Sequence, residues 1–72
     1  MAIDQEKLSY WFERRNVQPE QEILVESIRH TAKAFAQSIL DHTPPSSDQS
    51  AAIRKVREAM LIAMDAATGG RY

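Results

Sequence analysis

The chain has 72 residues, with 9 basic and 10 acidic side chains for a net charge of −1, and no cysteine. A chain of this length forms one domain at most and buries little of its surface, so self-association often supplies the missing stability. The balanced charge argues against a general binder of duplex nucleic acid, and the missing cysteines exclude disulfides and thiolate sites. His30 and His42 make a poor zinc pattern, so we expect neither a metal nor a cofactor.

The sequence also argues against membrane proteins and enzymes. No apolar run approaches the length of a membrane span, and residues 1–7 carry too many charges for a signal peptide. We therefore expect no membrane contact and an intracellular protein. No cysteine nucleophile, glycine-rich phosphate loop or suitably spaced Ser–His–Asp set is present, so we expect no enzyme activity and no catalytic residue.

Residues 1–18 form an N-terminal segment that we expect to be helical or extended. Asp4 is placed to cap a short helix. Three large apolar side chains share one side of that helix: Leu8, Trp11 and Phe12. Two interpretations of the aromatic run stay open. It forms either a hydrophobic latch over the rest of the fold, or a stacking platform for a planar ligand beside Arg14 and Arg15.

Residues 19–42 are predicted to form the first long helix. Pro19 suits its first turn, and Glu20 and Glu22 complement its positive end. Apolar residues at spacings of three and four form one seam along it: Val25, Ile28, Ala32, Phe35 and Ile39. The pattern is typical of a helix that buries one side.

One flank of this helix carries charges of both signs. Arg29 and Lys33 lie four residues apart, with Glu22 and Glu26 on the same side. Taken alone, the spacing is explained by an ordinary ion pair within the helix, Glu26 with Arg29. His30 is expected to face solvent.

Residues 43–47 are predicted to form a turn. Pro44 and Pro45 cannot continue the preceding helix, because the proline ring clashes and the amide donor is missing. Ser46 or Ser47 then accepts a hydrogen bond from the first unpaired amides of the next helix.

Residues 48–68 are predicted to form the second long helix, and the glycines of residues 69–72 end it. Its seam has the same spacing as the first: Ile53, Val56, Met60, Ala63 and Ala67. Beside this seam an alanine recurs every seven residues: Ala52, Ala59 and Ala66. Leu61 and Ile62 fall well away from the seam, which indicates that this helix packs on both sides in an assembly.

Together these elements predict an all-α fold. Two matched seams joined by a short turn form an antiparallel helical hairpin, preceded by the N-terminal segment. Because the core of such a hairpin is small, we expect it to assemble into a compact homo-oligomer.

The residues around the turn also resemble a known family. The run from Thr43 to Ala66, T-P-x-S-x-D-Q-S-x-A-I-x-K-V-x-E-A-M-x-x-A-x-x-A, is similar to the hairpin domain of phage anti-CBASS cyclic-nucleotide sponges, a domain that also occurs in sponges of Thoeris signals. Upstream, Ile28-Arg29 followed by Lys33 and Phe35-Ala36 resembles the family's I/L-R-x-K-x-K-(E)-L-A segment. The likeness covers the chain from about Phe12 to Ala67.

The resemblance implies a protein that performs no chemistry. Such proteins assemble as compact hexamers and sequester the cyclic di- and trinucleotides that bacterial immune cyclases make. The implied partners are therefore cyclic oligonucleotides and further copies of the chain, without membrane or duplex nucleic acid. The implied location is the cytoplasm of the infected bacterial host.

The resemblance also implies a set of ligand-binding residues. The phosphate-facing candidates are two pairs of basic side chains: Arg29 and Lys33 first, then Arg14 and Arg15. Trp11 or Phe12 is expected to stack on a base. A second pocket, made by several protomers, would be lined by residues of the turn and the tail: Thr43, Pro44, Ser46 and Arg71.

Departures from the family pattern leave the choice of ligand open, at Arg14, Thr31, Ser47, Ile62 and Met64. Two other functions remain as alternatives. The first is a small helical protein-interaction module of phage origin that binds a partner through Leu61 and Ile62. The second is a DNA-binding helical dimer, whose binding would depend strongly on salt and would use three basic residues: Arg54, Lys55 and Arg57.

Overall fold

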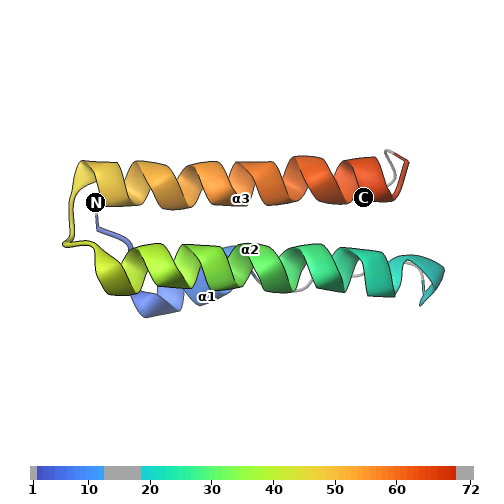
Figure 1. Ribbon diagram of the computed structural model, residues 1–72, viewed down its shortest axis with the longest axis horizontal. Coiled ribbons are helices and arrows are strands. Elements are labelled where there is room, and N and C mark those ends of the chain that lie inside the picture. Colours follow the sequence, from blue (N-terminus) through green and yellow to red (C-terminus); the bar gives the residue numbers. More distant parts are fainter. Residues whose placement is uncertain (1, 13–18, 70–72) are drawn as a thin grey trace.

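The computed structural model describes residues 2–12 and 19–69. Within these ranges the chain forms three α-helices, α1 (Gln5–Trp11), α2 (Glu22–His42) and α3 (Ser47–Ala67), with a 3-10 turn η1 (Pro19–Gln21) leading into α2, and no strand (Figure 1). The all-α class is therefore confirmed. None of these helices is both long and apolar enough to cross a membrane.

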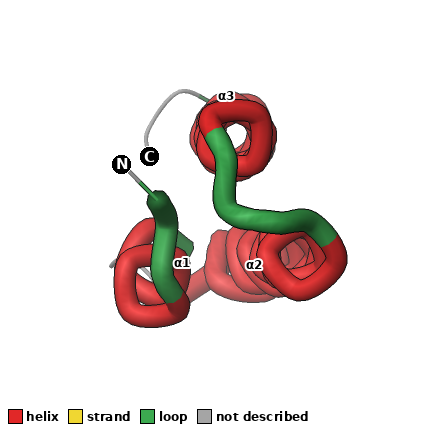
Figure 2. The backbone as a smooth tube through the Cα atoms, turned by 90° about the vertical axis from the view of Figure 1, so that its left-hand side faces the viewer, coloured by secondary structure: helices red, strands yellow, loops and turns green. Residues whose placement is uncertain are grey.

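The helices lie side by side in an elongated molecule of 39 × 17 × 17 Å. Helices α2 and α3 run in opposite directions along the long axis (Figure 1). Seen from the end, α1, α2 and α3 lie at the corners of a triangle (Figure 2). A reciprocal pair of amide hydrogen bonds between Gln5 and Gln37, of 2.7 and 2.8 Å, joins the start of α1 to the last turns of α2.

Short polar side chains begin the helices, as their sequence pattern predicts. Asp4 Oδ1 accepts a hydrogen bond of 2.7 Å from the Lys7 amide at the start of α1. Ser46, one of the two serines expected to cap α3, accepts a hydrogen bond of 3.1 Å from the Gln49 amide. At the other end of α3, Gly69 adopts a φ of 66°, which a glycine tolerates without steric cost.

All three helices contribute to one core. The fully or nearly fully buried apolar side chains are Ile3, Leu8, Phe12, Val25, Ala36, Ile53, Met60 and Met64. Two predictions about this core are wrong. Phe35, placed in the seam of the first long helix, is 60% exposed. Leu61, placed well away from the seam of the second, is partly buried against the core.

The third helix explains both differences. The predicted seams assumed that α2 and α3 face only each other. In the structure α1 packs on one side of the pair, and the buried side chains turn toward it. Ala36 is buried in place of Phe35, and Met64 is more deeply buried than Ala63. Neighbouring residues lie about 100° apart around a helix, so this difference of one residue is a rotation of the buried face toward α1.

The turn between α2 and α3 is held by a buried amide. The Gln49 Nε2 group donates to the Thr43 carbonyl at 3.0 Å, to Thr43 Oγ1 at 3.1 Å and to the Leu40 carbonyl at 3.4 Å. Gln49 is 3% exposed. It therefore supplies a donor to the last carbonyls of α2, which have no partner within their own helix.

We predict that Gln49→Leu lowers the free energy of unfolding by about 1 kcal/mol, because it removes these donors while conserving the apolar part of the side chain. Urea denaturation followed by helical circular dichroism measures the effect. Gln37→Leu, which removes an amide nearer the surface, is expected to cost less. Equal costs for the two variants would show that the buried amide has no special part in the turn.

Candidate functional site

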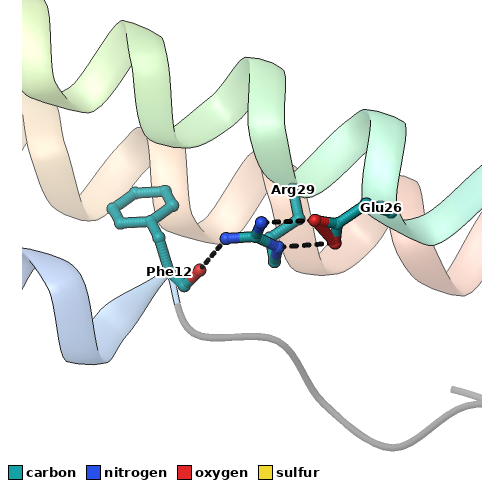
Figure 3. Close-up of polar contacts among 3 residues, drawn as sticks. All are labelled: Phe12, Glu26 and Arg29. Atoms are coloured by element: carbon teal, nitrogen blue, oxygen red, sulfur yellow. Dashed lines mark hydrogen bonds and ion pairs between the residues drawn. The ribbon is translucent and has the colours of Figure 1, made fainter.

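The best-defined polar cluster joins α1 to α2 at Arg29. Its Nε donates to Glu26 Oε2 at 2.8 Å, its Nη2 donates to Glu26 Oε1, and its Nη1 donates to the Phe12 carbonyl at 3.0 Å (Figure 3). The Arg29 side chain is 16% exposed, and that of Glu26 is 42% exposed. The ion pair predicted from the i, i+3 spacing is therefore present. Its two parallel hydrogen bonds make it stronger than a pair joined by a single hydrogen bond.

The same guanidinium fastens the end of α1. Phe12 is the C-cap residue of α1. Helix ends leave carbonyl groups without a partner in the helix, and a cationic donor satisfies such a carbonyl well. Arg29 thus has a structural role in addition to any contact with a ligand.

Lys33 lies one helical turn after Arg29 and has fewer polar contacts. Its side chain is half-buried, and it forms no ion pair or hydrogen bond with any part of the chain that the structure describes. An ammonium group in this position is available to an anion. Arg29 and Lys33 therefore differ: one cation is already paired, and the other is not.

The two aromatic candidates have separate environments. Phe12 is fully buried in the core, so its ring presents no face to a ligand, and the latch interpretation holds for this residue. Trp11 is half-buried, and two cations lie near its ring, Lys7 Nζ at 5.6 Å and Arg57 Cζ at 5.4 Å from the ring centroid. Both distances are within the range of a cation–π interaction.

The Arg57 contact was not predicted, although a signal for it exists. Arg57 follows the buried Ile53 by four residues, so it lies close to the buried face of α3. Its Nε is buried without a hydrogen-bond acceptor in the described ranges. Arg54 and Lys55 are exposed, whereas Arg57 is half-buried, so the three basic residues of α3 differ in exposure.

The turn residues of the second predicted pocket are only partly brought together. Thr43 Oγ1 donates to the Ile39 carbonyl at 2.6 Å, and Ser46 Oγ accepts the capping hydrogen bond of α3. Ser46 lines a small hollow of about 320 Å³ with Ser50 and Arg54, whereas Thr43 and Pro44 do not line it. Arg14, Arg15 and Arg71 lie outside the described residues, so their places in either pocket are predictions.

A larger feature is an apolar groove along α2 and α3. It has a volume of about 670 Å³, and no residue of α1 lines it. Its lining is almost entirely apolar: Ile28, Ala32, Phe35, Ile39, Ala52, Val56, Ala59, Met60 and Ala63, with Ser27, Thr31 and Lys55 at its edges. Two of the alanines that recur every seven residues lie in it, Ala52 and Ala59. Small side chains at that spacing let another helix approach closely.

In the described part of the chain, no group of three or more His, Cys, Asp or Glu side chains is placed to hold a metal ion. Comparisons with models of known protein families, with curated proteins and with solved structures find no match to this chain. Membership in the sponge family therefore stays a prediction, and a function has to be inferred from the groove, the cations and the sequence pattern.

Proposed function

We propose that this chain is a non-catalytic subunit of a homo-oligomer that binds and sequesters cyclic di- or trinucleotides. The observation that carries the proposal is the apolar groove along α2 and α3. A groove of about 670 Å³ with Phe35 exposed in it is a large apolar area for a chain of 72 residues. Contiguous apolar surface of this kind marks an interaction site.

A further copy of the chain is the proposed occupant of the groove. The assembly unit is the antiparallel hairpin of α2 and α3, and the resemblance around Thr43–Ala66 supports a hexamer built from it. Self-association also supplies the apolar burial that so short a chain lacks by itself. Leu61 is partly buried within the subunit, so the groove is a better candidate interface than the Leu61 and Ile62 surface.

The cations of α2 are the proposed binding site for the phosphates. A cyclic dinucleotide presents two phosphates and two planar bases, which require positive charges at fixed positions and a flat surface. Arg29 and Lys33 lie one turn apart on a rigid helix of 21 residues. Trp11 is one of two aromatic side chains of α1, and the core leaves it partly accessible. Sites at subunit interfaces enclose a ligand more completely than one small chain does.

The biological role that follows is interference with signalling. A protein that binds a cyclic nucleotide tightly and does not convert it lowers the free concentration of that signal. In an infected bacterium, the immune effectors that respond to the signal would then stay inactive. We propose that the protein acts there as a phage-encoded sponge.

Lys33→Ala is expected to weaken the binding of a cyclic dinucleotide by roughly tenfold or more, because it removes a cation that forms no ion pair or hydrogen bond in the described part of the chain. Lys33→Arg, which conserves the charge, should retain most of the affinity. Arg29→Ala should abolish binding but is also expected to lower stability, so it is the less direct test. Isothermal calorimetry and thermal shift, with the linear dinucleotide as the control ligand, measure these effects.

If no cyclic di- or trinucleotide raises the melting temperature, the nucleotide role is wrong. The groove then favours the second candidate, a helical module that binds another protein. An amphipathic helix seats its apolar side in a groove of this type. In that case assembly with the partner would not respond to nucleotides at all.

A further inference from the structure

We propose that Glu26 is an internal competitor for the phosphate site and sets its affinity. In the free protein, its carboxylate occupies the part of the Arg29 guanidinium that a ligand phosphate would bind. This inference rests on the proposed function and deepens it. It identifies a residue that tunes the site without serving as a ligand contact.

The first argument is the match between the two anions. Glu26 receives two parallel hydrogen bonds from Arg29, from Nε and from Nη2 (Figure 3). Carboxylate and phosphate bind the guanidinium fork with the same two-oxygen geometry. A phosphate on these donors therefore requires that Glu26 leave them.

The second argument is that Glu26 is able to leave. Its side chain is 42% exposed, against 16% for Arg29, so it reaches solvent by rotating its own side chain. The third donor, Nη1, is directed to the Phe12 carbonyl at 3.0 Å and holds the guanidinium in place during the exchange.

The third argument concerns the charge left beside the ligand. After the exchange, the Glu26 carboxylate remains on the same helix flank as the bound phosphate and repels it. Both effects, the occupied fork and the repulsion, lower the affinity of the unaltered protein. Removing the carboxylate should therefore tighten binding, which is the opposite of what the loss of a ligand contact would do.

Glu26→Gln is expected to bind cyclic dinucleotides roughly threefold to tenfold more tightly, since the fraction of Arg29 available to the ligand rises. Glu26→Ala, which leaves no acceptor, should show at least as large a gain if it remains folded. The probes are cyclic di-AMP and cyclic di-GMP, measured by calorimetry, with inorganic pyrophosphate as a phosphate probe without bases. Circular dichroism checks that each variant is folded.

The matched control is Glu58→Gln. It makes the same change in net charge on α3, where Glu58 is well exposed and lies 3.9 Å from Lys55, whereas Arg29 and Glu26 are both on α2. A gain with Glu26→Gln and none with Glu58→Gln supports the inference. An equal gain in both variants reduces it to a general effect of charge and overturns it.

The other outcomes separate the inference from the function on which it rests. If the unaltered protein binds a ring and Glu26→Gln binds it equally or more weakly, the inference fails while the proposed function stands. If only Glu26→Gln binds, the competitor is confirmed. If neither binds any ring or pyrophosphate, the nucleotide function fails and the inference fails with it.

Discussion

Replacing Phe12 with alanine is expected to lower the free energy of unfolding by about 3–5 kcal/mol, the usual cost of emptying a buried phenylalanine site. Phe12 is fully buried and is the largest side chain of that kind in the described core. It lies at the C-terminal end of α1, a helix of only seven residues. A helix this short has little stability of its own in water, so its packing decides whether it forms.

The single tryptophan makes this effect measurable at α1 itself. Trp11 precedes Phe12, and its ring lies 5.4 Å from Arg57 Cζ of α3, so its fluorescence reports whether α1 is docked. Helical circular dichroism reports mainly α2 and α3. In Phe12→Ala, urea should expose Trp11 at a low denaturant concentration. If the fold is cooperative, most of the helical signal is lost at the same concentration. If α1 detaches first, Trp11 is exposed before the helical signal falls.

Tyr10→Ala is the matched control, because it removes another aromatic ring from the same helix. Tyr10 is 72% exposed, and its loss should change the free energy of unfolding by less than about 0.5 kcal/mol. Similar losses for the two variants would contradict the core position of Phe12. They would also mean that burial of Phe12 is not what holds α1 against the other helices.

Phe35→Asp is expected to convert the proposed homo-oligomer into monomers, with a loss of association of roughly a hundredfold or more per interface, because it places a charge in an apolar contact without a partner. The stability of the isolated subunit should change little, since Phe35 is 60% exposed within it. This combination, assembly lost and fold retained, is specific to an interface residue. Light scattering after size exclusion, over a range of concentrations, measures the mass.

Ile62→Asp provides the control for this variant. Ile62 is 63% exposed, does not line the groove, and belongs to the surface on which the sequence predicts a second contact. We expect it to leave the mass unchanged. If Ile62→Asp dissociates the assembly and Phe35→Asp does not, the groove is not the interface and the protein-interaction alternative gains support.

The Phe35→Asp variant also connects assembly to ligand binding. If the ligand site lies between subunits, monomeric Phe35→Asp should bind cyclic dinucleotides far more weakly than the unaltered protein. Full affinity in the monomer would place the site within one chain. Arg29, Lys33 and Trp11 would then be sufficient.

Local features of this protein are determined by the sequence alone. The caps at Asp4 and Ser46, the break at Pro44 and the pairing of Glu26 with Arg29 are all confirmed. Each depends on residues at most four positions apart. Steric and hydrogen-bonding rules over one helical turn are enough to predict them. For the same reason the all-α class and the long helices follow from the chain.

The tertiary structure decided which side of each helix is buried. The periodicity of α2 places Phe35 in the apolar seam, and Ala36 lies about 100° further round the helix. The tertiary fold buries Ala36, exposes Phe35 in the groove and packs Leu61 against the core. It also brings Arg57 close to Trp11. In the same way it brings the Phe12 carbonyl to Arg29, which is 17 residues away in the sequence. Contacts of this kind depend on where a third helix packs. The periodicity of a single helix does not carry that information.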